Sequence, residues 1–167
     1  MLNIETRVDY LIYKISKLII CNICGAKQFV RFENLRREVP SCKRCGSSVR
    51  MRQLIHCLSQ QLFGKSMVLA KMPINKKIKG IGLSDWDGYA NILSDKFDYT
   101  NTFYHIEPQL DITSPPANKI NTLDFIISSD VFEHVLPPVQ KAFDGAYFLL
   151  KPGGCLILTL PYHNEGH

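Results

Sequence analysis

The chain has 167 residues, 46% of them hydrophobic and 21% charged, with a formal net charge of +5. These values fit one ordinary domain plus a small module, and they exclude a disordered or fibrous protein. Residues 1–79 carry sixteen Lys and Arg against four Asp and Glu, whereas residues 80–167 carry four against eleven. This asymmetry predicts two units with different partners, unless a basic surface packs against an acidic one.

Apolar side chains recur at helical spacing over residues 6–20, which predicts an amphipathic helix there. The stretch is too short and too charged to span a bilayer, because Asp9, Lys14 and Lys17 interrupt it. It also lacks the basic start and the cleavage site of a signal peptide. We therefore expect a cytoplasmic protein with no membrane partner.

Two cysteine pairs with C-x2-C spacing follow this segment. Cys21 and Cys24 form the first pair, Cys42 and Cys45 form the second, and a glycine follows each pair. Paired knuckles of this kind are typical of a zinc ribbon, in which four thiolates complete a tetrahedral site. The alternative is four idle or disulfide-bonded thiols.

A second helix is predicted over residues 48–63, where apolar side chains share one face and Gly64 ends the pattern. Residues 65–77 then form a basic connector. The two remaining cysteines, Cys57 and Cys155, lie in apolar segments and are expected to be small core residues.

From residue 78 onward the pattern alternates between strand and helix. Strands are predicted at 77–83, 102–107, 124–129 and 155–160. Helices are predicted at 89–97 and 138–150, and a sharp Lys-Pro-Gly-Gly turn precedes the last strand. The alternation predicts an α/β fold with a doubly wound parallel sheet. The predicted division of the chain is 1–64, 65–77 and 78–167.

In such a sheet, ligands bind beyond the carboxyl ends of the strands. The first strand ends in a glycine-containing turn, which lets a backbone approach a ligand but also suits any tight turn. The second ends in Glu107, where an acid would grip a nucleotide ribose, although a solvated loop acid is the alternative. The third leads into Asp130, Glu133 and His134, two acids and an imidazole at the expected ligand edge.

Several segments resemble a known family. Residues 124–135 read Asp-Phe-Ile-Ile-Ser-Ser-Asp-Val-Phe-Glu-His-Val, residues 148–154 read Phe-Leu-Leu-Lys-Pro-Gly-Gly, and residues 156–161 read Leu-Ile-Leu-Thr-Leu-Pro. They resemble the second half of a class I S-adenosylmethionine-dependent methyltransferase. The two cysteine knuckles, with the Gly-Ser-Ser-Val-Arg-Met-Arg-Gln-Leu run of residues 46–54, resemble the zinc-ribbon module of one branch of that family. The resemblance implies a Rossmann-like sheet of about five strands and S-adenosylmethionine as donor.

The resemblance also implies roles for individual positions. The loop 80–85 would face the methionine part of the donor, Glu107 would hold the ribose, and Ser129 and Asp130 would line the other side. Apart from the resemblance, Glu133 and His134 are the acid–base candidates for methyl transfer, and the alternative for both is a structural role at the strand–helix junction. The full set expected around the donor is Gly80, Gly82, Ser84, Asp85, Glu107, Asp111, Ile112, Ser129 and Asp130, with Asp111 and Ile112 near the adenine.

The sequence departs from the family pattern in two places, the first loop and the C-terminal end. The first loop reads Gly-Ile-Gly-Leu-Ser-Asp-Trp in place of an acid followed by G-x-G-x-G. The family fold also continues beyond its fifth strand, so the chain is expected to be C-terminally truncated. The strand at 155–160 would then have an unpaired edge and would favour self-association.

The leading expectation is methyl transfer to a small molecule or a saccharide. RNA is a further possible acceptor, because basic residues of the N-terminal half could contact its phosphates. Those residues are Arg31, Arg36, Arg37, Lys43, Arg44, Arg50 and Arg52. The alternative from another class is a non-catalytic zinc-ribbon module that binds nucleic acid or an acidic partner.

Overall fold

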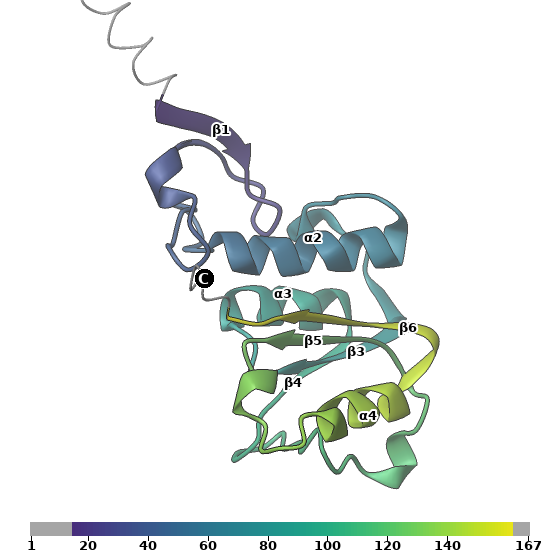
Figure 1. Ribbon diagram of the computed structural model, residues 1–167. Coiled ribbons are helices and arrows are strands. Elements are labelled where there is room, and N and C mark those ends of the chain that lie inside the picture. The colour runs from purple at the N-terminus through teal and green to yellow at the C-terminus, as the bar shows by residue number, and fades with distance from the viewer. Residues whose placement is uncertain (1–14, 162–167) are drawn as a thin grey trace, which may run out of the picture.

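A computed structural model of the protein describes residues 15–161 and contains a four-stranded parallel sheet between helical layers (Figure 1). The strands are β3 (Asn75–Leu83), β4 (Phe97–Thr102), β5 (Leu123–Ser129) and β6 (Leu150–Thr159). Their order is β4-β3-β5-β6, and every neighbouring pair is parallel. This confirms the predicted α/β fold with a Rossmann-like sheet, although the described part of the chain has four strands in place of about five.

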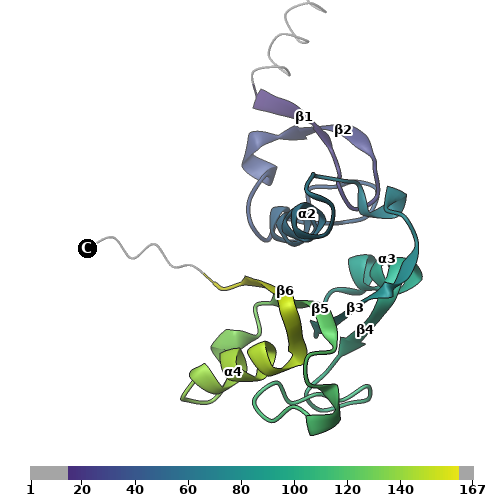
Figure 2. The same ribbon diagram turned by 90° about the vertical axis from the view of Figure 1, so that its right-hand side faces the viewer.

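Helices cover both faces of the sheet (Figure 2). Helices α2 (Val49–Phe63) and α3 (Asp87–Lys96) pack on one face, and α4 (Gln140–Leu149) packs on the other. Helix α2 begins at the Ser48 cap and ends at Gly64, whose φ of 67° is left-handed. Both ends agree with the sequence prediction. Short 3-10 turns occupy Phe32–Asn34, Leu69–Lys71, Ala117–Lys119 and Phe132–His134.

One hydrophobic core crosses the predicted boundary between the N-terminal region and the sheet. Ile23 from the first knuckle and Leu58 from α2 are buried in the same cluster as Leu93 from α3 and Phe125 from β5. A second cluster, which includes Ile126, lies between the sheet and α4. The N-terminal region therefore packs on the sheet through a shared core, and the division at 65–77 remains a prediction.

The helix predicted over residues 6–20 is wrong for its last part. Strand β1 (Ser16–Ile20) pairs antiparallel with β2 (Lys27–Arg31), and Ile20 lies opposite Lys27. The hairpin closes around the first cysteine knuckle, so cross-strand pairing overrides the helical spacing of these few apolar residues. Residues 6–14 lie outside the described part of the chain.

The second strand of the sheet lies earlier than predicted. The sequence prediction was 102–107, but β4 spans Phe97–Thr102 and the following residues form a loop in which Phe103 bridges Gln109. In β4, buried Phe97 and Tyr99 alternate with exposed Asp98 and Thr100. That period of two is the signal of a half-buried strand, and the prediction assigned Phe97 to the preceding helix instead.

Strand β6 and the two cysteines outside the knuckles agree only in part with the sequence prediction. Strand β6 begins at Leu150, so the predicted Lys-Pro-Gly-Gly turn lies within it as a register irregularity. Within residues 15–161, β6 pairs with β5 alone, and self-association through its edge remains a prediction. Cys155 is half-buried against the first core as expected, but Cys57 is exposed, because it lies on the solvent side of α2.

Candidate functional site

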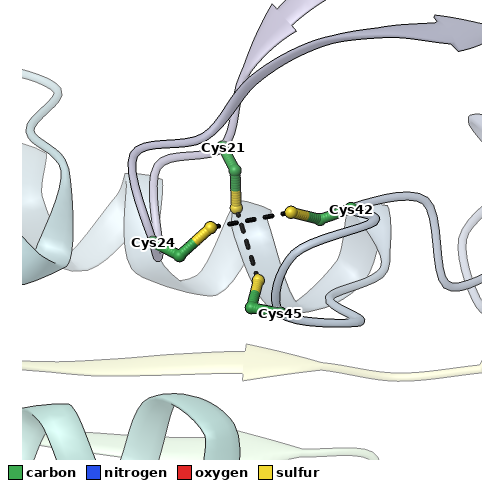
Figure 3. Close-up of side chains that lie close together, drawn as sticks. All are labelled: Cys21, Cys24, Cys42 and Cys45. Atoms are coloured by element: carbon green, nitrogen blue, oxygen red, sulfur yellow. Dashed lines mark hydrogen bonds between the residues drawn. The ribbon is translucent and has the colours of Figure 1, made fainter.

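The four knuckle cysteines converge on one point (Figure 3). Their sulfur atoms all lie within 4.8 Å of one another, with Cys21 Sγ 3.7 Å from Cys45 Sγ and Cys24 Sγ 3.6 Å from Cys42 Sγ. Zinc–sulfur bonds of about 2.3 Å in a tetrahedron would separate the sulfurs by about 3.8 Å. The donor set and its spacing therefore fit a zinc ion, as the sequence predicts.

The local backbone brings each cysteine pair into this position. Gly25 (φ 78°) and Gly46 (φ 75°) have left-handed conformations that favour glycine. The N–H of each glycine donates to the carbonyl of the first cysteine in its pair, at 2.8 Å in both knuckles. Both cysteines of a pair are thereby turned toward the centre of the cluster.

Burial and local hydrogen bonds shift the pKa values of Cys24, Cys42 and Cys45. Burial raises the pKa of Cys24 to about 12, with neighbouring thiols adding to the effect, and burial also raises the pKa of Cys45. Burial acts to raise the pKa of Cys42 as well, but the amides of Cys45 and Arg44 outweigh it and lower the pKa to about 7. A bound cation would stabilise all four thiolates together.

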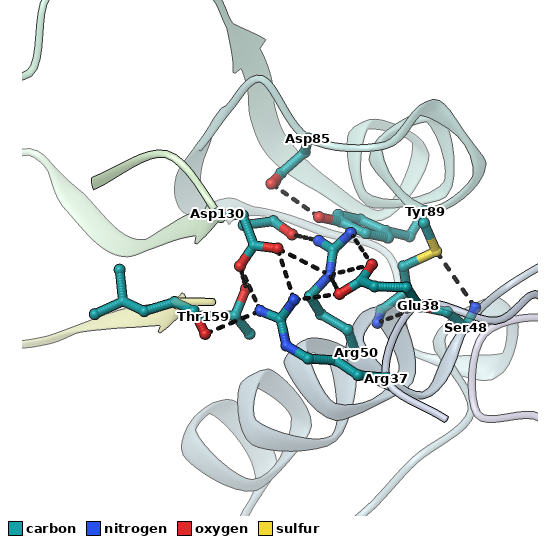
Figure 4. Close-up of polar contacts among 11 residues, drawn as sticks. Arg37, Glu38, Ser48, Arg50, Asp85, Tyr89, Asp130 and Thr159 are labelled. Carbon is teal, nitrogen blue, oxygen red and sulfur yellow. Dashed lines mark hydrogen bonds and ion pairs between the residues drawn. The ribbon is translucent and has the colours of Figure 1, made fainter. Parts of the chain in front are cut away.

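The predicted ligand edge is formed by the carboxyl ends of β3, β5 and β6. The strand order reverses between β3 and β5, which is where a doubly wound sheet binds its ligands. Ser129 and Asp130, which sequence analysis assigned to this edge, lie at the end of β5. Two arginines from the N-terminal region contact them. Arg37 binds the Asp130 carboxylate (Figure 4). Arg50 donates to Ser129 Oγ. The hydrogen bond from Arg37 lowers the pKa of Asp130 despite partial burial.

Asp85 points into the protein. Its side chain is buried, and it accepts hydrogen bonds from Tyr89 Oη at 2.8 Å and from Tyr99 Oη at 2.6 Å. Burial raises the pKa of Asp85 to about 7, although both tyrosine hydroxyls act to lower it. Of the predicted loop, Ser84 is the exposed member, and its φ of 55° turns the chain at the end of β3.

Two predicted glycines have packing roles in the structure. A Cβ at Gly80 would run into the ring of Phe125, and a Cβ at Gly82 would run into the Tyr99 hydroxyl and the Asp85 carboxylate. Both positions are in β3, where the aromatic and carboxylate side chains cross over the strand. These contacts explain the glycines without a ligand.

Glu107 lies apart from the ligand edge described above. It lines a cavity of about 390 Å³ together with Gly80 on β3 and Thr100 on β4. One carboxylate oxygen, Oε2, accepts a hydrogen bond from the Gln109 amide at 2.9 Å, and the side chain is exposed. The structure thus separates the predicted donor residues into an edge group around Asp130 and a cavity group around Glu107.

The other predicted positions are divided between surface and core. Asp111 Oδ1 accepts from Thr113 N at 2.8 Å in a local turn, and Ile112 is buried beneath α4. Glu133 and His134 are exposed in the 3-10 turn that follows Asp130. Their proposed acid–base role remains a prediction.

The arginine contacts also change the predicted nucleic-acid surface. Arg37 and Arg50 bind the ligand edge, and Arg52 donates to Ser47 O at 2.8 Å and to Ser41 Oγ at 2.7 Å. Arg31 also pairs with Glu33 at 3.4 Å, so four of the seven cations proposed to contact RNA bind groups within the protein. For Arg37 and Arg50 these contacts could not be anticipated from the sequence, because Asp130 and Ser129 lie far away along the chain.

Comparisons with known proteins match the sheet region. Residues 95–158, from the end of α3 to near the end of β6, match a family described as a methyltransferase domain. No curated protein matches the chain. Within residues 15–161, no helix is both long enough and apolar enough to cross a membrane.

One similar solved structure comes from Methanococcus maripaludis and is provisionally described as an S-adenosyl-L-methionine-dependent methyltransferase. It is 17% identical, with a TM-score of 0.42, and the match covers 65% of this chain. The match spans 55% of the length of that protein.

Proposed function

Because residues 95–158 carry the methyltransferase-domain sequence, we propose that this chain binds S-adenosylmethionine and transfers its methyl group. The family match carries the proposal, since it covers the strand β5 whose carboxyl end is the predicted ligand edge. The donor supplies an activated methyl group on a sulfonium, so the protein needs to bind, align and exclude water.

The residues at the edge suit such a donor. The donor's methionine part is a zwitterion, and the edge carries charged groups of both signs: the Asp130 carboxylate is ion-paired with the guanidinium groups of Arg37 and Arg50, and the donor would exchange some of these contacts for its own. Ser128 Oγ, one residue before the end of β5, is buried and has no hydrogen-bond partner among residues 15–161. A polar ligand atom or a water would satisfy it. Glu107 lines the separate cavity, so in this proposal the donor extends from the edge into that cavity, where Glu107 Oε1 accepts from the ribose hydroxyls.

The acceptor is proposed to be a small molecule or a saccharide. Methyl transfer to an oxygen or nitrogen nucleophile needs a base near the acceptor proton. Glu133 and His134 are the proposed candidates, because both are exposed beside Asp130 and free to meet an incoming substrate.

The cysteine cluster is proposed to hold a structural zinc ion in a cytoplasmic, reducing environment. Four thiolate ligands close a tetrahedral zinc site and leave no position for substrate, which is the pattern of a structural rather than catalytic zinc. The ion would stabilise the hairpin β1–β2 and the start of α2.

A calorimetric titration of the zinc-loaded protein with S-adenosylhomocysteine tests donor binding. We expect saturable binding to one site per chain. Glu107→Ala removes a charged acceptor of ribose hydroxyls worth about 1.5–3 kcal/mol, so its affinity should fall by about one to two decades. The matched control is Glu33→Ala, an exposed glutamate in the turn after β2. Absence of binding by the wild type would leave the non-catalytic zinc-ribbon alternative as the better account.

A further inference from the structure

Two arginines tie the N-terminal region to the carboxyl ends of β5 and β6. Arg37 Nη1 lies 2.9 Å from Asp130 Oδ2, and Arg37 Nη2 lies 2.5 Å from Asp130 Oδ1 and 3.1 Å from the carbonyl of Leu160. Arg50 Nε lies 3.2 Å from Asp130 Oδ2, and its Nη1 donates to Ser129 Oγ. Both strand ends are therefore held by guanidinium groups from another part of the fold.

Glu38 orients both arginines from the opposite side (Figure 4). Its carboxylate accepts from Arg50 Nε at 2.9 Å and from Arg50 Nη2 at 2.8 Å, and it also pairs with Arg37. The Arg50 side chain is only 15% exposed. A partly buried guanidinium bound by two carboxylates has a defined geometry, unlike an isolated surface pair.

The start of α2 is fixed by the second cysteine knuckle. Ser47 Oγ lies 3.4 Å from Cys21 Sγ and 3.3 Å from Cys45 Sγ. The Ser47 carbonyl accepts from the Cys42 amide at 3.1 Å and from Arg52 Nη1 at 2.8 Å. The next residue in the chain caps α2, and Arg50 is in its first turn. A continuous series of contacts thus joins the four sulfurs to Arg50.

We propose that the four-cysteine metal centre positions the ligand edge of the sheet. By holding the second knuckle, the metal sets Arg50, and with it Arg37, against Ser129 and Asp130. Arg37, Arg50 and Arg52 are positioning residues in this account, and the metal acts through them. The consequence for donor binding rests on the proposed function, whereas the coupling between metal and edge does not.

Coupling between two sites is reciprocal, so it is measurable from the metal side. If the metal strengthens the contacts at Asp130, loss of those contacts must weaken metal binding by the same factor. Zinc affinity is measured by competition with a chromophoric chelator in the wild type and in Asp130→Asn. Asp124→Asn is the matched control: Asp124 is also on β5 but at its opposite end, where Lys151 Nζ lies 2.8 Å from both carboxylate oxygens.

We expect Asp130→Asn to weaken zinc binding about fivefold or more, in the usual range of coupling between sites, and Asp124→Asn to leave it unchanged. Equal zinc affinities in the wild type and Asp130→Asn would overturn the proposal. A uniform loss in both variants would also overturn it, because it would reflect general destabilisation of β5.

A double-mutant cycle separates positioning from general destabilisation. Arg50→Gln should weaken zinc binding as Asp130→Asn does, and the double variant should lose little more, because both changes break the same contact. Arg50→Lys keeps the positive charge but lacks the planar set of N–H donors of the guanidinium group, so its zinc affinity should lie between those of Arg50→Gln and the wild type. Additive losses would overturn the proposal.

The second experiment compares the S-adenosylhomocysteine affinity of the zinc-loaded wild type with that of zinc-loaded Arg52→Gln, because Arg52 binds Ser47 and Ser41 beside the second knuckle and does not contact the ligand edge. Weaker binding by the variant supports a positioned edge, and equal binding overturns the donor part of the proposal. If the zinc-loaded wild type binds no S-adenosylhomocysteine, the proposed function fails, while the zinc-affinity cycle still decides the coupling.

Discussion

Replacing Asp85 with Asn should flatten the pH dependence of stability. The carboxylate is 4% exposed, and burial raises its pKa from 3.8 to about 7. The folded state therefore binds this proton more tightly than the unfolded state does. In the wild type, titration of Asp85 leaves the free energy of unfolding unchanged below about pH 4. It lowers that free energy as the pH rises from about 4 to 7, and it has no further effect above about pH 7. The full difference between the two pKa values corresponds to roughly 4 kcal/mol.

Urea unfolding at pH 5 and pH 8 measures the effect. The wild type should lose about 2–3 kcal/mol more than Asp85→Asn over this interval, because most of the titration lies within it. The Asn side chain keeps the size; its Oδ1 accepts from one tyrosine hydroxyl, and its Nδ2 donates to the other hydroxyl oxygen, which then acts as the acceptor. Asp98→Asn, which replaces an exposed carboxylate on β4, is the control and should follow the wild type. If the free energy of unfolding changed equally in the wild type and in Asp85→Asn between pH 5 and pH 8, Asp85 would not be a buried carboxyl that binds a proton in this range.

Three further predictions concern other parts of the fold. The purified protein should contain one zinc ion per chain, and Cys45→Ser should lower the metal content measured by elemental analysis, because one of four thiolates is lost; metal-free, folded wild type would contradict this. Gly82→Ala should destabilise the protein by about 1–3 kcal/mol in thermal or urea unfolding, because its Cβ would displace the Tyr99 hydroxyl; unchanged stability would argue against the close approach. Cys57 should react with a thiol reagent in the zinc-loaded protein well before Cys155, since Cys57 is exposed and burial raises the pKa of Cys155; the reverse order would contradict the orientation of α2.

Local sequence signals were sufficient to predict helix α2 and strand β5. Helix α2 is bounded by a serine cap and a left-handed glycine, and β5 is an apolar run that is buried on both faces. The strand β1 could not be predicted in this way, because its identity depends on pairing with β2 across the cysteine knuckle. For β4, the alternation of Phe97 and Tyr99 with polar residues was present in the sequence and would have placed the strand correctly.

The candidate site could likewise be predicted only where its residues are close together in the sequence. Cysteine spacing predicted the four-sulfur cluster, since each knuckle is a local structure. The arginines of the ligand edge could not be predicted, because Arg37 is 93 residues from Asp130 and Arg50 is 79 residues from Ser129. Only the packing of α2 on the sheet brings these groups together. The burial of Asp85 likewise depends on Tyr89 and Tyr99, which come from α3 and β4.

Photo-crosslinking of S-adenosylmethionine carrying a radioactive methyl group tests the central claim most directly, because it needs no acceptor. The zinc-loaded protein is irradiated with the donor, and the labelled peptides are identified by mass spectrometry. Our account predicts label in peptides containing residues 84–85, 107–112 or 129–130, and its loss when excess S-adenosylhomocysteine is added. Absence of label, or label confined to the hairpin of residues 16–31, would contradict a methyl-donor site at the carboxyl edge of this sheet.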